Sequence, residues 1–159
     1  MPHEPNPAHL RRAIELATQN VLAGTGGPFA AVIVRDGVVI AEAANSVTTT
    51  NDPTAHGEIN AIRKACAALG TFTLAGCEIY SSCEPCPMCL AAIYWARLEA
   101  IYYGCGQQEA AKAGFDDAFL YEEIARSAAE RSIPSVQLMQ AEAWHAFAAW
   151  IAQPSKVDY

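Results

Sequence analysis

Two short stretches of the chain carry side chains that bind transition metals and move protons. In "TAHGEIN" His56 stands two residues before Glu58, and in "SSCEPCPMCL" Cys86 and Cys89 are three residues apart. One imidazole and two thiolates are a common ligand set for Zn²⁺, and three protein ligands leave the fourth tetrahedral position for water. An open zinc position indicates catalysis, and a nearby carboxylate can carry protons between that water and a substrate. Glu58 suits this second task, because as a fourth ligand it would displace the water.

Cys83 opens two other interpretations of the cysteine cluster, since Cys83 and Cys86 are also three residues apart. A disulfide is one, but in a reducing cytosol cysteines mostly stay thiols. A closed structural zinc site made by His56 and all three cysteines is the other. Cys83 precedes Pro85, outside the helix expected to align the other two sulfurs, so we expect it to be a packing or supporting thiol. The three remaining cysteines lie in apolar contexts and are expected in the core: Cys66, Cys77 and Cys105.

The metal-binding group consists of His56, Cys86 and Cys89. We expect His56 at the start of one helix and the two cysteines at the start of the next. His56 and Glu58 would lie in the first turn of one helix, where side chains fan around the helix tip and can reach one pocket. Pro85 is expected to open the next helix, with Cys86 and Cys89 on one face of it. The dipole and free N–H groups of a helix start stabilise negative charge, which favours thiolates there.

Apolar periodicity and turn signals predict the elements that position these side chains. Helical spacing predicts helices over 7–24, 55–69, 85–97, 117–128 and 141–151. Apolar runs predict strands over 29–35, 38–44, 77–82, 99–104 and 135–140. Asp36 and Gly37 mark a hairpin turn between the first two strands, and strand–helix alternation later in the chain predicts parallel pairing. We therefore expect one α/β domain over residues 1–159, a three-layer α/β/α sandwich with a mixed five-stranded sheet.

The overall composition restricts the classes of partner. Seventeen Asp and Glu against ten Lys and Arg give a formal net charge of −7, and the basic residues are scattered singly or in pairs. Nucleic-acid binding requires clustered basic side chains, so no nucleic-acid partner is expected. No apolar run approaches the roughly 20 residues of a membrane span, and the N-terminal sequence has no apolar stretch of signal-peptide length. We therefore expect a cytoplasmic protein that does not bind a membrane.

Beyond residue types, the chain resembles a known enzyme family. H-x-E followed by P-C-x-x-C is the signature of zinc-dependent nucleobase deaminases, and both halves are present here. Nearly the whole chain is similar to the cytidine-deaminase-like superfamily, and within it to the small bacterial guanine deaminases. The similarity rests on "GGPFAAVIVRDG", "NDPTAHGEINAIRKAC", "SCEPCPMCLAAIYWAR", "AGFDDAFLYEE" and the final "DY".

The resemblance implies a set of catalytic roles. His56, Cys86 and Cys89 would hold one zinc ion per subunit, while Glu58 would take a proton from the water and deliver it to the purine ring. The resulting hydroxide would attack C2 of guanine and give xanthine and ammonia, a reaction of purine metabolism. Asp117 would contact the leaving amino group or carry a second proton. Choosing Asp117 over its neighbour Asp116 rests on the resemblance alone.

The resemblance also implies the contacts to a small purine substrate. Asn45 would hydrogen-bond the purine edge, and Phe29 and Trp95 would pack on the base. Tyr159 would close the pocket from the partner subunit of a homodimer, after exchange of the C-terminal segment over about 141–159. From the residues alone, Asn45 could be an ordinary turn residue, and both aromatic residues could be core residues.

One departure from the superfamily leaves the substrate open. Much of the superfamily has alanine where this chain has Gly57, and the missing Cβ is expected to alter the pocket floor. Another base, a triazine or a nucleoside (cytosine, ammeline, guanosine) is therefore an alternative to guanine. Deamination of adenosine in tRNA would need a basic surface that the sequence lacks. A zinc-stabilised scaffold is the non-enzyme alternative, and the presence of Glu58 argues against it.

Overall fold

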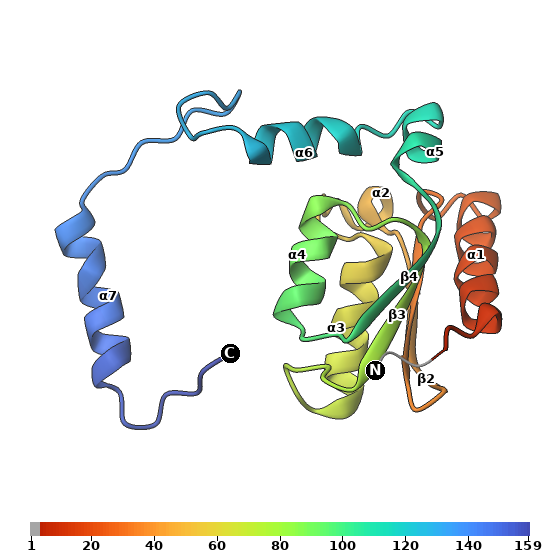
Figure 1. Cartoon of the computed structure of the whole chain (residues 1–159), viewed down its shortest axis with the longest axis horizontal. Helices are drawn as coiled ribbons and strands as arrows, with labels where there is room; N and C mark the ends of the chain where they lie inside the picture. The colour runs from red at the N-terminus through yellow and green to blue at the C-terminus, as the bar shows by residue number, and fades with distance from the viewer. Residues whose placement is uncertain (1–3) are drawn as a thin grey trace. The chain divides into compact units, whose positions relative to one another are not determined.

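The structure is a computed structural model that describes residues 4–159. The chain separates into two compact units, Met1–Leu120 and Tyr121–Tyr159. The first unit holds a helix, a hairpin and a series of alternating strands and helices (Figure 1). Its elements are α1 (Pro7–Leu22), β1 (Ala30–Arg35), β2 (Val38–Ala44), α2 (Val47–Thr50), α3 (Gly57–Leu69), β3 (Cys77–Cys83), α4 (Pro87–Trp95), β4 (Ala100–Cys105), α5 (Gln107–Lys112) and the start of α6 (Asp117–Ala125).

The strands of the first unit form one mixed sheet in the order β2-β1-β3-β4. β1 is antiparallel to both β2 and β3, while β3 and β4 are parallel. Figure 1 shows α1 on one face of this sheet and α3 and α4 on the other. The expected α/β/α layering with a mixed sheet is therefore confirmed.

The uninterrupted apolar sequence of β1 follows from burial on both faces of the sheet. Ala31 and Ile33 belong to the core cluster that includes buried residues of α3 and α4. Val32 and Val34 point the other way, into a second cluster with Ala13 of α1. Because successive side chains of a strand alternate between faces, a central strand covered on both sides places its apolar side chains in both layers of the core.

The expected fifth strand over 135–140 is wrong, since the sheet of the described residues has four strands. Residues 134–139 are in neither a helix nor a strand, and the apolar side chains of Val136 and Leu138 are exposed. A strand requires a neighbour that pairs with its backbone, which alternation of apolar residues alone does not provide. Cys105, expected in the core, is also exposed, because it lies at the end of the edge strand β4.

The second unit contains the end of α6 and one long apolar helix, α7 (Gln140–Ala152). The buried carboxylate of Glu123 organises the turn after α6, where it accepts hydrogen bonds from Ser132 N and Oγ, both at 2.7 Å. In contrast, α7 contains no buried residue although its sequence includes Trp144, Phe147 and Trp150. This helix therefore carries an apolar surface that its own unit does not cover.

Asn60 on α3 fixes the polar segment between β2 and α3. Its amide Nδ2 donates to Ala44 O at 3.0 Å, Ser46 Oγ at 3.1 Å and Ala55 O at 3.3 Å. We expect Asn60→Ala to lower the free energy of unfolding by about 1–3 kcal/mol, because it removes three partly buried hydrogen bonds at once. Denaturant unfolding followed by circular dichroism measures this change.

Arg63, one turn later on the same helix, provides the control for Asn60. Its exposed side chain lies 3.7 Å from Asp52, a surface ion pair of about 0–1 kcal/mol. Arg63→Ala should therefore unfold close to the wild type. Equal unfolding midpoints for the two variants would show that Asn60 does not hold this segment.

Candidate active site

Three metal-ligating atoms converge where the chain enters α3 and α4. His56 is the residue immediately before the first turn of α3, and Cys86 holds the same position before α4. The imidazole Nδ1 of His56 lies 3.6 Å from Cys86 Sγ and 3.5 Å from Cys89 Sγ. The ligand atoms of the three residues all lie within 4.8 Å of one another. Both helices begin slightly later than the sequence suggested: α4 starts at Pro87 rather than Pro85, so Cys86 caps the helix instead of lying inside it.

The electrostatics of this group fit a divalent cation. The pKa of the Cys86 thiol is lowered to about 4, first by its hydrogen bond with Cys89 and then by the one with His56. The pKa of Cys89 is raised by the same pairing with Cys86 and by burial. Hydrogen bonding to Cys86 raises the pKa of His56. A cation between the three atoms would stabilise both thiolates, and two sulfurs with one imidazole nitrogen are ligands that zinc prefers.

Glu58 lies directly beside the metal-binding group, on the first turn of α3. Its side chain is buried, with 4% of the residue exposed. One carboxylate oxygen, Oε1, accepts a hydrogen bond from Ser81 Oγ at 3.1 Å, and the other, Oε2, lies 3.5 Å from Cys89 Sγ. Burial raises the pKa of Glu58, because an ionised carboxylate loses hydration there. A carboxylate with a raised pKa next to a metal site is suited to accept and release protons.

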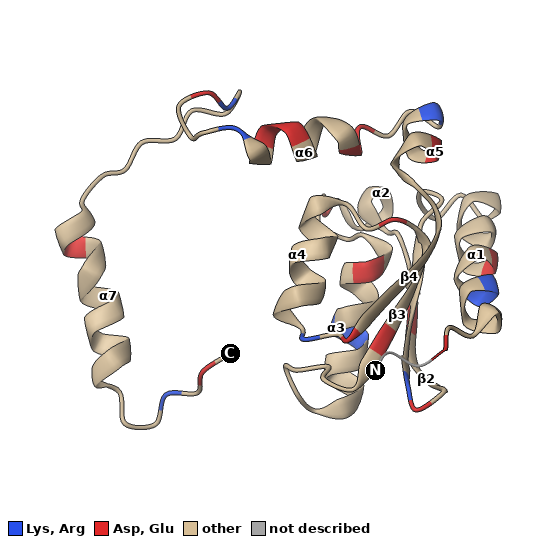
Figure 2. Cartoon of the chain, in the orientation of Figure 1, with Lys and Arg blue, Asp and Glu red and all other residues tan. Residues whose placement is uncertain are grey.

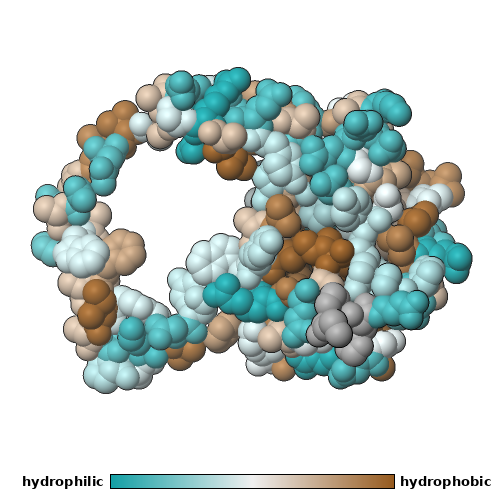
Figure 3. All heavy atoms as spheres, in the orientation of Figure 1, coloured by the Kyte–Doolittle hydropathy of each residue, from teal (hydrophilic) through white to brown (hydrophobic). Residues whose placement is uncertain are grey.

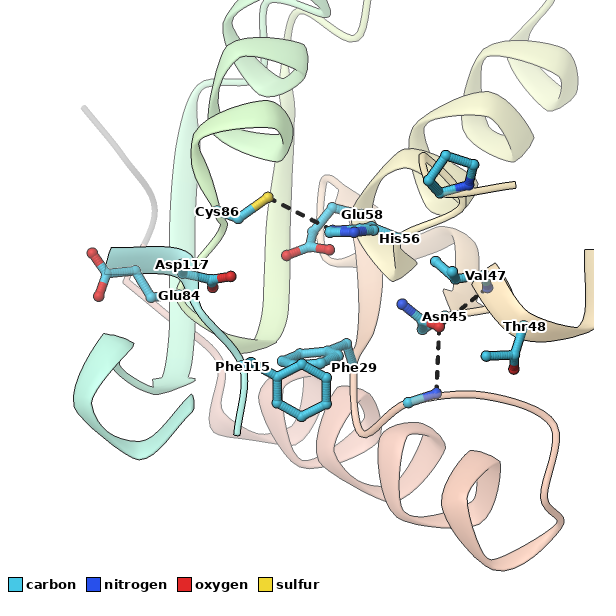
Figure 4. A pocket seen from close by; sticks show the side chains of 12 residues that line it. Phe29, Asn45, Val47, Thr48, His56, Glu58, Glu84, Cys86, Phe115 and Asp117 are labelled. Carbon is cyan, nitrogen blue, oxygen red and sulfur yellow. Dashed lines mark hydrogen bonds between the residues drawn. The ribbon is translucent and has the colours of Figure 1, made fainter. Parts of the chain in front are cut away.

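A cavity of about 270 Å³ opens in front of these residues. Its wall includes six residues that the sequence singled out: Phe29, Asn45, His56, Glu58, Cys86 and Asp117. Figure 4 shows their side chains around one space, with the carboxylate of Asp117 directed toward it. Asp117 lines the cavity and is partly buried, whereas Asp116 is exposed. The pKa of Asp117 is raised, mainly by burial and then by the charge of Cys86.

Asn45 presents a hydrogen-bond donor to the cavity. Its Oδ1 accepts hydrogen bonds from Gly27 N at 3.3 Å and Val47 N at 3.2 Å. These two bonds fix the orientation of the amide, because only the oxygen can accept from backbone N–H groups. In Figure 4 the amide nitrogen consequently points toward the cavity. A ligand with an acceptor nitrogen or oxygen on its edge would match this donor.

Three residues of the predicted substrate site are not part of the cavity wall. Trp95 is at the end of α4, 62% exposed, and is absent from the cavity wall. Tyr159 belongs to the second unit and is 73% exposed. Gly57 does not form the pocket floor, because a Cβ at this position would lie 2.8 Å from Ala30 Cα. Gly57 instead allows the first turn of α3 to approach the backbone of β1 closely.

Other residues of the site were not predicted from the sequence. Phe115 packs edge-on against Phe29, with ring centroids 4.6 Å apart, and lines the cavity. Glu84 also lines it, and Ser81 contacts Glu58. All three lie in the stretches "SSCEPC" and "GFDD", close in sequence to the predicted site residues. This closeness was the signal that could have identified them. The remaining wall residues are Gly27, Val47, Thr48 and Pro53.

Comparisons with known proteins agree with this geometry. Residues 4–105 match the family described as the cytidine and deoxycytidylate deaminase zinc-binding region. The chain is 55% identical over 150 residues to the guanine deaminase of Bacillus subtilis, covering 94% of this chain and 96% of the relative. The X-ray structure of guanine deaminase from Bacillus subtilis superposes with a TM-score of 0.94 at 53% identity, over 100% of this chain and 99% of the other.

A second relative matches only locally. The tRNA-specific adenosine deaminase of Agrobacterium fabrum is 52% identical over 77 residues, which covers 48% of this chain and 51% of the relative. The zinc-binding region is thus shared widely, whereas the match to the Bacillus subtilis protein continues through the C-terminal unit. The chain belongs to the cytidine and deoxycytidylate deaminase family of zinc-binding enzymes, and its likeness to a bacterial guanine deaminase extends over the whole described fold.

Proposed function

We propose that this protein is a zinc-dependent aminohydrolase that converts guanine and water to xanthine and ammonia. The observation that carries the proposal is the full-length likeness to a guanine deaminase, combined with a cavity whose wall holds Asp117 together with His56 and Cys86 of the metal-binding group. The polar residues around the cavity supply a donor from Asn45 and carboxylates from Glu58 and Asp117. A purine edge with alternating donors and acceptors fits such a mixed lining.

His56, Cys86 and Cys89 would hold the zinc ion, since their ligand atoms already converge. When bound, zinc acts as a Lewis acid and lowers the pKa of a coordinated water toward about 7. Glu58 would accept a proton on Oε2, the oxygen nearest Cys89, and deliver it to a ring nitrogen of the substrate. Ser81 would hold the other oxygen in place. The raised pKa of Glu58 favours this exchange, because a higher pKa makes the carboxylate a better proton acceptor.

The remaining wall residues would select the base. Phe29 and Phe115 form an edge-on aromatic pair at the cavity, a surface on which a flat purine can pack. Asn45 would donate to an acceptor atom of the purine edge, and Asp117 would accept from the amino group that leaves as ammonia. Burial around Asp117 strengthens such a charge-assisted hydrogen bond. Trp95 would act with Tyr159 only as part of an assembly, because neither lines the cavity of the described fold.

Several observations support a homodimer with exchanged C-terminal segments. The apolar helix α7 has no buried residue, and α4 contains no charged residue and exposes Tyr94 and Trp95. Figure 3 shows hydrophobic side chains gathered over α4. β4 is also an edge strand of the four-stranded sheet, so residues 134–139 of a second copy, which carry the exposed side chains of Val136 and Leu138, would be a suitable pairing neighbour. Such an assembly would bury these surfaces and bring Tyr159 of one copy toward the cavity of the other.

Some alternative substrates would require a different protein surface. Deamination of tRNA would require clustered basic side chains, and Figure 2 shows Lys and Arg dispersed along a chain of net charge −7. Another base, a triazine or a nucleoside would use the same metal-binding group, so it stays an alternative that substrate tests address.

None of the described helices is long and apolar enough to cross a membrane. None of the six cysteines forms a disulfide, which agrees with the proposed cytoplasmic location.

Ammonia release tests the substrate directly. The zinc-loaded protein should release ammonia from guanine, with xanthine as the second product, when offered guanine, guanosine, adenine, cytosine, cytidine and ammeline in parallel. A coupled glutamate dehydrogenase assay and chromatography of the product measure the two outcomes. Turnover of another member of this set without turnover of guanine would contradict the proposed substrate while leaving the zinc chemistry in place.

Glu58→Gln should retain one zinc per chain and lose turnover by about 10²–10⁴-fold, because the amide keeps the shape of the side chain but cannot accept the proton. Steady-state kinetics and metal analysis measure the two effects. Glu122→Gln, an exposed change on α6, is the matched control and should behave as the wild type. Substantial turnover by Glu58→Gln would remove Glu58 from the mechanism.

Removal of Val157 to Tyr159 tests the proposed closure by the C-terminal tail. We expect zinc content to stay at the wild-type level and kcat/KM for guanine to fall by about tenfold or more, because an aromatic ring that covers the base is lost. Tyr159→Phe separates the ring from its hydroxyl and should lose less. Unchanged kinetics after truncation would show that the tail does not contribute to the site.

A further inference from the structure

Glu84 lines the cavity, yet its carboxylate does not point into it. The residue stands between the end of β3 and Cys86, and its backbone N donates to Cys105 O at 2.8 Å. In Figure 4 the Glu84 carboxylate is directed away from His56 and Glu58, whereas the Asp117 carboxylate is directed toward them. A direct contact between Glu84 and a bound substrate is therefore not indicated.

The carboxylate of Glu84 instead receives two hydrogen bonds from one residue. Gln107, the first residue of α5, donates its backbone N to Oε2 at 3.3 Å and its side-chain Nε2 to Oε1 at 3.2 Å. The first N–H groups of a helix have no partner within the helix, so an external carboxylate that accepts one of them fixes the helix start. Glu84 thereby connects the loop that carries Cys86 to the start of α5.

The end of α5 leads directly to the substrate side of the cavity. Gly114 N donates to Ala111 O and Phe115 N donates to Ala110 O, both at 3.0 Å, so the turn after α5 is bound to the last turn of that helix. Gly114 has a φ of +90°, which glycine adopts without strain. Phe115 and Asp117 follow at once and line the cavity. A movement of α5 would consequently move both side chains.

We propose that Glu84 is a positioning residue for substrate selection: through its paired hydrogen bonds with Gln107, it sets the position of α5 and hence of Phe115 and Asp117 relative to the metal-binding group. The inference rests on the proposed roles of Phe115 and Asp117 in binding the base. It gives the glutamate of "CEPC" a function separate from metal binding. Glu84 acts only through Gln107 and α5, and the substrate contacts belong to the residues that follow.

The test is a double-mutant cycle on Glu84 and Gln107. Glu84→Ala should raise the KM for guanine by about tenfold with a smaller change in kcat, because the wall of the cavity is displaced but the metal-binding group is not. Gln107→Ala should have a similar effect. The double variant should be no worse than either single variant, because both remove the same connection. Zinc content should stay at the wild-type level in all three.

A binding measurement separates positioning from chemistry. In the Glu58→Gln background, calorimetry with guanine should show about tenfold weaker binding when Glu84→Ala is added. Glu84→Gln can still accept from Gln107 Nε2, and it should restore most of the affinity. Glu109→Ala is the matched control, because Glu109 Oε2 accepts from Gly106 N at 3.0 Å and supports the same helix without reaching the Cys86 loop. This control should leave the KM for guanine within about twofold of the wild type.

Each other outcome would overturn the inference. Loss of zinc from Glu84→Ala would assign the residue to the metal loop, and additive effects in the cycle would show that Glu84 and Gln107 act separately. If Glu109→Ala had an equal effect, the hydrogen bonds between Glu84 and Gln107 would only be part of the general support of α5. Failure of the wild type to deaminate guanine is a separate result that contradicts the proposed function, and the cycle would then be measured with the base that is turned over.

Discussion

The close approach of the first turn of α3 to β1 is the constraint on which the site depends. Gly57 lies so near the backbone of Ala30 that a Cβ would be only 2.8 Å from Ala30 Cα. The two neighbours of Gly57 in the chain are His56 and Glu58. His56 reaches the sulfurs of Cys86 and Cys89, while Glu58 becomes buried against Ser81 of β3. One contact between a helix and a strand therefore holds the metal ligand and the proton-carrying group at the same cavity.

Burial of Glu58 is costly by itself, and its surroundings offset that cost. An ionised carboxylate loses hydration in a protein interior, and a hydroxyl and a thiol are modest replacements for water. A cation held beside it by His56, Cys86 and Cys89 would add a favourable charge within a short distance. The arrangement is thus consistent with a carboxylate kept for chemistry, because an apolar side chain at this position would pack at lower cost.

The sequence was informative where chemistry and local pattern coincide. His56, Cys86 and Cys89 could be grouped from residue type and spacing, and the structure brings their ligand atoms together. The layered fold followed from apolar strands and helical periodicity. Phe115 and Glu84 could not be assigned in this way, because their places depend on α5, a short helix fixed by contacts between distant segments. The same limitation explains residues 135–140, whose apolar pattern suited a strand that has no pairing neighbour in the described chain.

The small size of the C-terminal unit bears on the proposed homodimer. Units below about 40 residues seldom bury enough apolar surface to fold alone, and the unit Tyr121–Tyr159 is of this size. Its helix α7 has aromatic side chains but no buried residue, so a further apolar surface is needed to stabilise it. A second copy of the chain would offer such a surface in the uncharged helix α4 and a pairing edge in β4. In that assembly the energy that stabilises the tail would also order the residues that close the cavity, so dimerisation and substrate selection would depend on the same contacts.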